Sequence, residues 1–95
     1  MELSDYLKND YKVYVDVNED HLSDGRIIPL SFLWEDGRRY LVDEVKDICP
    51  AASLKAGGVG LRYTIRVGSR QSYMWLEEDQ DVYRWFMERR ELKSA

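Results

Sequence analysis

Residue types that build many active sites are scarce in this chain. Its 95 residues include one cysteine, Cys49, and one histidine, His21. A single cysteine excludes an internal disulfide and is typical of a reducing compartment. A single histidine with no cysteine or histidine companion gives little support to a zinc site or a histidine-dependent triad. We therefore expect no metal and no cofactor.

Long apolar runs and a basic excess are also missing. No apolar stretch approaches the roughly 18 residues typical of a membrane-spanning helix, and residues 1–10 lack the basic start and apolar stretch of a signal peptide. These absences predict a cytoplasmic protein with no membrane partner. The net charge is −4, with the acidic excess in the N-terminal half, which argues against a non-specific polyanion binder.

What the chain contains is the composition of one β-rich domain. It is long enough to bury a single core and too short for two domains, so residues 1–95 are predicted to form one unit. Residues 1–10 are predicted to fray or to form a short helix, and residues 11–91 to form the β-barrel core. Strict alternation from residue 11 to residue 17 predicts a half-buried strand, and the polar residues 18–25 predict a loop.

The strongest local signal is Asp36-Gly37, which stands between two apolar alternating runs. Asp-Gly in this setting is typical of a two-residue β-hairpin loop. Such a loop would pair Phe32 with Leu41 and would gather on one face the side chains of Ile28, Leu30, Phe32, Trp34, Leu41 and Val45. Pro29 predicts an edge position or a bulge, because proline cannot donate to a strand ladder.

A second hairpin is predicted around Gly68-Ser69, with a two-residue loop. Its inward set would be Leu61, Tyr63, Ile65, Ser72, Met74 and Leu76. Its outward set, which we take as the candidate binding residues, is Arg62, Thr64, Arg66, Gln71, Tyr73 and Trp75. Single-strand nucleic-acid readers and peptide-binding barrels use this mixture of guanidinium, hydroxyl, amide and aromatic groups. The plainer alternative is that Arg62 only covers Trp75 in an exposed cation–π pair.

The remaining segments are less distinctive. Residues 47–60 are rich in small side chains and are predicted to form a long connection. Residues 81–91 are compatible with a helix or a strand; their aromatic content favours a strand, while Met87 to Leu92 could form a short terminal helix. Five or six short strands joined by tight turns predict a mainly β protein, a small antiparallel barrel of SH3-like architecture.

Three further features suggest chemistry, and each has a more ordinary explanation. Lys55 and the glycines after it suggest an anion-cradling loop, but their order is not that of a P-loop. Asp43 on an apolar face could be a poised acid, although such carboxylates more often meet an arginine. The acidic residues at 77, 78, 79 and 81 lack the spacing of a calcium loop. We predict no enzymatic activity and no metal site.

Two resemblances accompany this pattern. The run PLSFLWEDGRRY (residues 29–40), continued by KAGGVGLRY (residues 55–63), resembles small uncharacterised β-rich proteins of Gram-positive bacteria over most of residues 11–90. The hairpin alone is similar to short bacterial domains encoded near translesion DNA polymerases, which implies a role related to nucleic acid and DNA repair. Neither resemblance assigns functional residues.

Together these observations predict a binding or adaptor module that recognises a protein partner, or a second copy of itself, through its Arg/aromatic face. Arginine, tryptophan and tyrosine are the side chains that dominate interface energetics. The alternative is a single-stranded nucleic-acid-binding domain. In that case Tyr73 and Trp75 would stack on bases, and Arg62 and Arg66 would meet phosphates.

Overall fold

The structure is a computed structural model that describes residues 12–51, 59–79 and 81–89. These residues contain no α-helix and form seven strands: β1 (Lys12–His21), β2 (Ile27–Leu33), β3 (Arg39–Leu41), β4 (Glu44–Ala51), β5 (Val59–Val67), β6 (Arg70–Asp79) and β7 (Val82–Glu88). The prediction of a mainly β, antiparallel, barrel-like fold is confirmed. The predicted number of strands, five or six, is too low.

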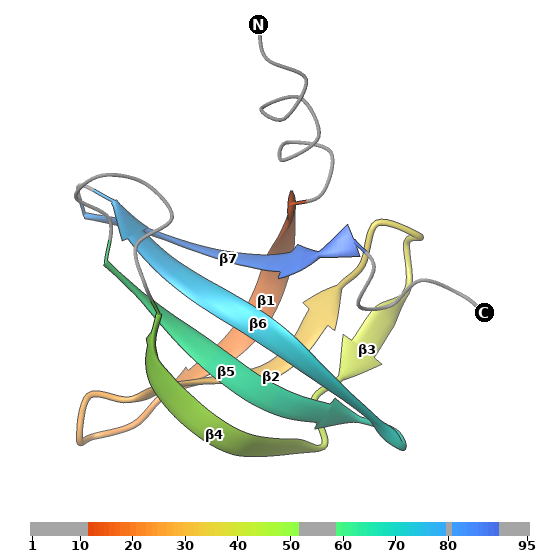
Figure 1. Cartoon of the computed structure of the whole chain (residues 1–95), viewed down its shortest axis with the longest axis horizontal. Helices are drawn as coiled ribbons and strands as arrows, with labels where there is room; N and C mark the ends of the chain where they lie inside the picture. Colours follow the sequence, from red (N-terminus) through yellow and green to blue (C-terminus); the bar gives the residue numbers. More distant parts are fainter. Residues whose placement is uncertain (1–11, 52–58, 80, 90–95) are drawn as a thin grey trace, which may run out of the picture.

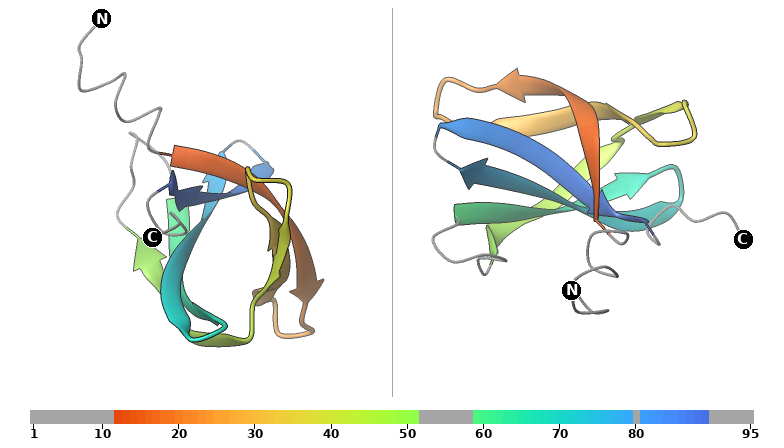
Figure 2. Two further views of the ribbon diagram at one scale, coloured as in Figure 1. Left: turned by 90° about the vertical axis from the view of Figure 1, so that its right-hand side faces the viewer. Right: turned by 90° about the horizontal axis from the view of Figure 1, so that it is seen from above.

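The strands form one curled antiparallel sheet in the order β3-β2-β1-β7-β6-β5-β4. Strands that follow one another in sequence are neighbours, except β3 and β4, and the first strand pairs with the last. This is the order of an up-and-down barrel without a ladder between β3 and β4, and the sheet curls into a half-barrel (Figures 1 and 2). Two residues cross the open seam: Val42 donates its N–H to Leu30 on one edge, and Asp43 donates to Arg66 on the other.

The core lies on the inner face of this curl and is built from Val13, Val15, Phe32, Trp34, Tyr63, Ile65, Met74, Leu76, Trp85 and Met87. Tyr63 of β5 is only 1% exposed. Its hydroxyl donates a hydrogen bond of 2.6 Å to the Ile27 carbonyl oxygen of β2, and its ring centroid lies 4.9 Å from that of Trp85. Tyr63 therefore ties together two walls of the half-barrel that are not neighbours in the sheet.

The hairpin of β5 and β6 has the register predicted from the sequence. Nine residue pairs run without a break from Val59–Glu78 to Val67–Arg70. The loop between them is two residues long and begins with Gly68, whose φ is +62°. Glycine adopts this left-handed conformation without steric cost, as the two-residue hairpin loop requires.

The register predicted for the first hairpin is wrong by one residue. Phe32 pairs with Tyr40, not with Leu41. The loop has three residues, 35–37, and two backbone hydrogen bonds close its base. Gly37 adopts a φ of +84° at its end. This is the arrangement of a type I turn followed by a left-handed bulge residue, which Asp-Gly suits as well as it suits a two-residue loop.

A one-residue shift of register exchanges the two faces of a strand. Tyr40 and Val42 consequently pack against the core, whereas Leu41, predicted to face inward, is 67% exposed. Leu30, also predicted to face inward, is 44% exposed because it is the extra residue of a β-bulge in β2. Pro29 precedes Leu30 in this irregular stretch, so the predicted bulge is confirmed.

The polar loop predicted at residues 18–25 is shorter than expected. Strand β1 continues to His21, and a three-residue loop with Gly25 at a φ of +96° follows. This loop has the same form as the loop at residues 35–37. Asp24 in one loop and Asp36 in the other accept a hydrogen bond from the backbone N–H two residues later. That hydrogen bond to the charged form is the main reason why the pKa of each carboxyl is lower than usual.

Two predictions about the C-terminal half have different outcomes. The long connection predicted at residues 47–60 is wrong at its start, because strand β4 continues to Ala51. Residues 82–88 form strand β7, as favoured. Short helices were predicted at residues 1–10 and 87–92; residues 1–10 and 90–92 lie outside the described residues, and Met87 and Glu88 belong to β7 instead. No described segment is a helix long and apolar enough to cross a bilayer.

Candidate functional site

The six residues predicted to bind lie together on the outward face of the β5–β6 hairpin. Directly opposed pairs are Arg62 with Trp75, Thr64 with Tyr73 and Arg66 with Gln71. Each of the six is partly or fully exposed. The cross-strand pairing that the sequence predicted is therefore present, and the contacts between these side chains decide what the face can offer to a partner.

Arg62 does not cover Trp75, as the plainer alternative predicted. Its guanidinium lies over the ring of the diagonal neighbour Tyr73, 5.1 Å from the ring centroid. Trp75 instead stacks on Phe86 of β7, with centroids 5.3 Å apart and ring planes 4° from parallel. Diagonal neighbours on a sheet are within reach of long and aromatic side chains. Arg62 makes no ion pair with any residue that the structure describes.

The aromatic surface continues beyond the predicted hairpin. Phe86 is paired with Trp75 on one side and with Tyr14 of β1 on the other, and the Tyr14 and Phe86 rings meet edge to face at 5.9 Å. We call Tyr73, Trp75, Phe86 and Tyr14 the aromatic row. Phe86 is only 4% exposed, whereas Tyr14 is 44% exposed. The row therefore crosses three adjacent strands with exposed rings on either side of a covered centre.

The carboxylate of Glu77 organises the cations beside this row. It accepts a hydrogen bond of 2.7 Å from Arg84 and lies 3.5 Å from the Lys12 ammonium. Burial would by itself raise the pKa of Glu77, but the charges of Lys12 and Arg84 outweigh it and hold the pKa below its usual value. Lys12 also lies 4.3 Å from the Phe86 centroid, and Arg84 lies 4.7 Å from the Tyr14 centroid. Lys12 and Arg84 therefore each contact both the Glu77 carboxylate and an aromatic ring.

The other polar members of the predicted set are also engaged. Arg66 contacts the Glu44 carboxylate at 3.3 Å and donates to the Gly68 carbonyl oxygen at 2.6 Å. Gln71 accepts from Lys46 at 3.4 Å. Exposed pairs of this kind contribute little to stability.

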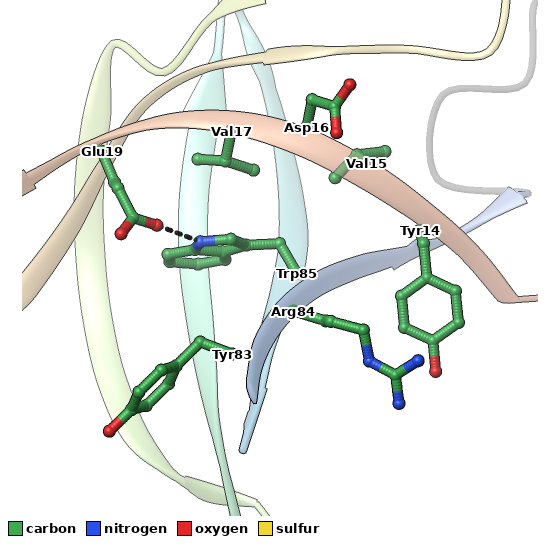
Figure 3. A pocket seen from close by; sticks show the side chains of 8 residues that line it. All are labelled: Tyr14, Val15, Asp16, Val17, Glu19, Tyr83, Arg84 and Trp85. Carbon is green, nitrogen blue, oxygen red and sulfur yellow. Dashed lines mark hydrogen bonds between the residues drawn. The ribbon is translucent and has the colours of Figure 1, made fainter. Parts of the chain in front are cut away.

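A pocket of about 420 Å³ opens where β1 and β7 separate (Figure 3). The ladder between the two strands ends at Val15–Trp85, and the pocket is lined by residues 14–17 and Glu19 of β1 and by residues 83–85 of β7. Glu19 accepts a 2.6 Å hydrogen bond from the Trp85 indole across the gap and lies 2.6 Å from His21 Nε2. No local sequence pattern indicates this pocket, because it depends on pairing between strands at the two ends of the domain.

The other residues that the sequence suggested for chemistry make structural contacts where the structure describes them. Asp43 does not face Leu30; it lies exposed at the seam and accepts a 2.6 Å hydrogen bond from the Gly68 N–H. Glu77 belongs to the ion cluster described above. The described residues contain no group of three or more His, Cys, Asp or Glu side chains that could hold a metal ion. Lys55 and the first two glycines after it lie outside the described residues.

Comparison with known proteins gives no match: no family model, no curated protein and no solved structure is significantly similar to this chain.

Proposed function

We propose that this protein is a binding module that recognises a protein partner, or a second copy of itself, through the aromatic row and Arg62. The observation that carries the proposal is the outward set of Tyr14, Trp75 and Tyr73, together with the Arg62 guanidinium, which lies over the Tyr73 ring and makes no ion pair within the described residues. Tyrosine, tryptophan and arginine are the residues most enriched among interface hot spots. The outward face of the curled sheet presents such residues in partly or fully exposed positions.

The charge distribution favours protein over nucleic acid. Phosphate recognition needs cations that are free to neutralise the backbone. On this face Lys12 and Arg84 are paired with Glu77, and Arg66 is paired with Glu44. A partner that met these side chains through mixed polar and aromatic contacts would not have to break the ion pairs.

Single-stranded nucleic acid is the second candidate, favoured by Arg62 and by the partly exposed rings of Tyr73 and Trp75. Base stacking needs an open ring face, and one face of Trp75 is already taken by Phe86. We therefore rank this function below protein recognition. The proposal includes no catalytic step, and it places the protein in the cytoplasm, where Cys49 can remain a free thiol. The SH3-like assignment stays a prediction on which the proposal does not depend.

The first test uses immobilised wild-type protein to capture partners from a cell extract and sedimentation to detect self-association. We expect Trp75→Ala and Arg62→Ala to abolish the capture or the self-association. Arg70→Ala is the matched control, because Arg70 is an exposed arginine at the end of the same hairpin, outside the outward set. If a partner binds all four proteins equally, the proposed surface is wrong.

A salt titration separates the two candidates. Labelled single-stranded and double-stranded oligonucleotides are mixed with wild type and with Trp75→Ala at low and at moderate salt. Binding to phosphates weakens steeply as salt rises, whereas an interface of rings and paired charges is comparatively insensitive. Salt-sensitive binding that Trp75→Ala abolishes would move the nucleic-acid function to first place.

A further inference from the structure

The pocket between β1 and β7 has open strand edges on both sides. Beyond Val15–Trp85, strand β1 pairs with β2 only, from Asp16 to His21, and residues 82–84 of β7 pair with β6 only. The two strands thus leave the sheet split at one end, with the edge of β7 turned toward the gap. An extended peptide can add to such an edge through main-chain hydrogen bonds, while side-chain pockets supply the specificity.

Two side chains that line the pocket make no polar contact with the described part of the chain. Tyr83 is 56% exposed and makes no hydrogen bond or ring contact there. Asp16 is exposed and makes no hydrogen bond or ion pair there. An exposed tyrosine presents an apolar ring and a polar tip, and for this reason tyrosine is enriched at interfaces.

The charge of this pocket is predominantly negative. Glu19 lines it on the same face of the sheet as Tyr83, Asp16 lines it on the opposite face of β1, and Glu78 lies directly opposite Tyr83 on β6. Arg84 also lines the pocket, but its guanidinium turns toward Tyr14 (Figure 3) and is paired with Glu77. Carboxylates beside an exposed tyrosine ring form a receptor for a cation, because the ring face and the carboxylates both attract positive charge.

We propose that the gap between β1 and β7 is a second binding site, which takes an extended peptide segment carrying lysine or arginine. The peptide backbone adds to the free edge of β7 at residues 82–84. Its cationic side chain lies between Tyr83 and the carboxylate of Glu19, which share one face of the split. A volume of about 420 Å³ is in the range of sites that bind small ligands and single side chains of a partner.

The test is a titration of ¹⁵N-labelled protein with three five-residue peptides, followed through its amide resonances. The first is acetyl-Thr-Lys-Val-Lys-Thr-amide, the second has glutamate in place of each lysine, and the third is the lysine peptide with N-methylated central amides. We expect only the first to shift the amides of Asp16 to Glu19 and of residues 82–84. Equal binding of the first two peptides would overturn the charge argument, and equal binding of the third would overturn strand addition.

Variants then locate the peptide. Tyr83→Ala should weaken binding about two- to fivefold, the loss expected for one exposed cation–π contact, whereas Tyr83→Phe should retain most of it. Glu19→Gln, which keeps an acceptor for the Trp85 indole but removes the charge, should also weaken binding, and Asp47→Asn, an exposed carboxylate on β4, should not. If the lysine peptide shifts no amide at millimolar concentration, or shifts only those of β5 and β6, the site is refuted.

The site is independent of the proposed function. Trp75→Ala should abolish partner capture and leave the peptide titration unchanged, so the failure of one proposal is distinguishable from the failure of the other.

Discussion

The hydroxyl of Tyr63 offers the sharpest test of the half-barrel. It is the donor of a 2.6 Å hydrogen bond to Ile27, which joins β5 to β2 across the core. Tyr63→Phe removes the donor and leaves the Ile27 carbonyl oxygen without it, while the buried ring and its packing on Trp85 remain. A lost hydrogen bond and a poorly satisfied acceptor together cost about 1–2 kcal/mol of the free energy of unfolding. For a domain of this size, that lowers the melting temperature by roughly 4–8 °C per kcal/mol.

Urea denaturation followed by tryptophan fluorescence measures the effect, and Tyr83→Phe supplies the control. The Tyr83 hydroxyl makes no hydrogen bond with a described residue, so its removal should change stability by less than about 0.5 kcal/mol. If Tyr63→Phe changes stability as little as Tyr83→Phe does, the hydroxyl does not bridge the two walls.

The same hydroxyl predicts a dependence on alkaline pH. Burial, and secondarily the charge of Glu19, raises the pKa of Tyr63 above the ordinary value of 10.0. Because the folded pKa is the higher one, the neutral hydroxyl contributes stability that is complete below pH 10 and is lost as pH rises above it. The difference in unfolding free energy between wild type and Tyr63→Phe should therefore be constant near neutral pH and should narrow at higher pH.

Further predictions concern the ion cluster, a loop and the core. The pKa of Glu77 is lowered from 4.5, so its ion pairs stabilise the fold above that pH and are lost below it; Glu77→Gln should lower stability at pH 7 and converge with wild type in acid denaturation curves. Gly37→Ala should lower the free energy of unfolding by about 1–2 kcal/mol in urea denaturation, because a φ of +84° strains a residue that has a side chain. No atom lies within 4 Å of the added Cβ, so backbone strain is the whole cost, and Gly37→Asn should cost less. Met74 is fully buried, and Met74→Ala should cost about 2–5 kcal/mol by the same assay.

The β5–β6 hairpin could be predicted in full because two independent signals agree there. The side chains of residues 61–67 alternate strictly, and Gly68-Ser69 allows a two-residue loop. One face of this hairpin is buried, so a shift of one residue would place its apolar side chains in solvent. Alternation and loop length therefore define a single register.

The first hairpin lacks that agreement. Tyr40 and Val42 on one side of the returning strand are as apolar as Leu41 on the other, so alternation does not choose between the registers. Asp-Gly fits a two-residue and a three-residue loop equally well, and the structure uses the three-residue form twice. Most of strand β4 was missed because Lys46, Asp47 and Pro50 are poor strand formers, which an edge strand tolerates.

Half of the aromatic row was beyond sequence reasoning. Tyr73 and Trp75 share a hairpin, and local pairing predicts their common face. Phe86 and Tyr14 join them only because β1 pairs with β7, so that residues 12–15 meet residues 85–88. Local alternation of side chains does not show which strands from the two ends of a domain will pair. The pocket was missed for the same reason, because it lies where the β1–β7 ladder ends.

The edges of the half-barrel explain why the split between β1 and β7 is the better place for an added strand. At the seam, β3 has only three residues. On the other side β4 carries Pro50, which cannot donate to a new ladder, and a bulge at Lys46. Short strands, proline, bulges and lysine are the devices that keep sheet edges from pairing with other chains. Residues 82–84 of β7 contain no proline and no bulge, and their one charged side chain, Arg84, is paired with Glu77, so an extended peptide meets fewer obstacles there than at either outer edge of the sheet.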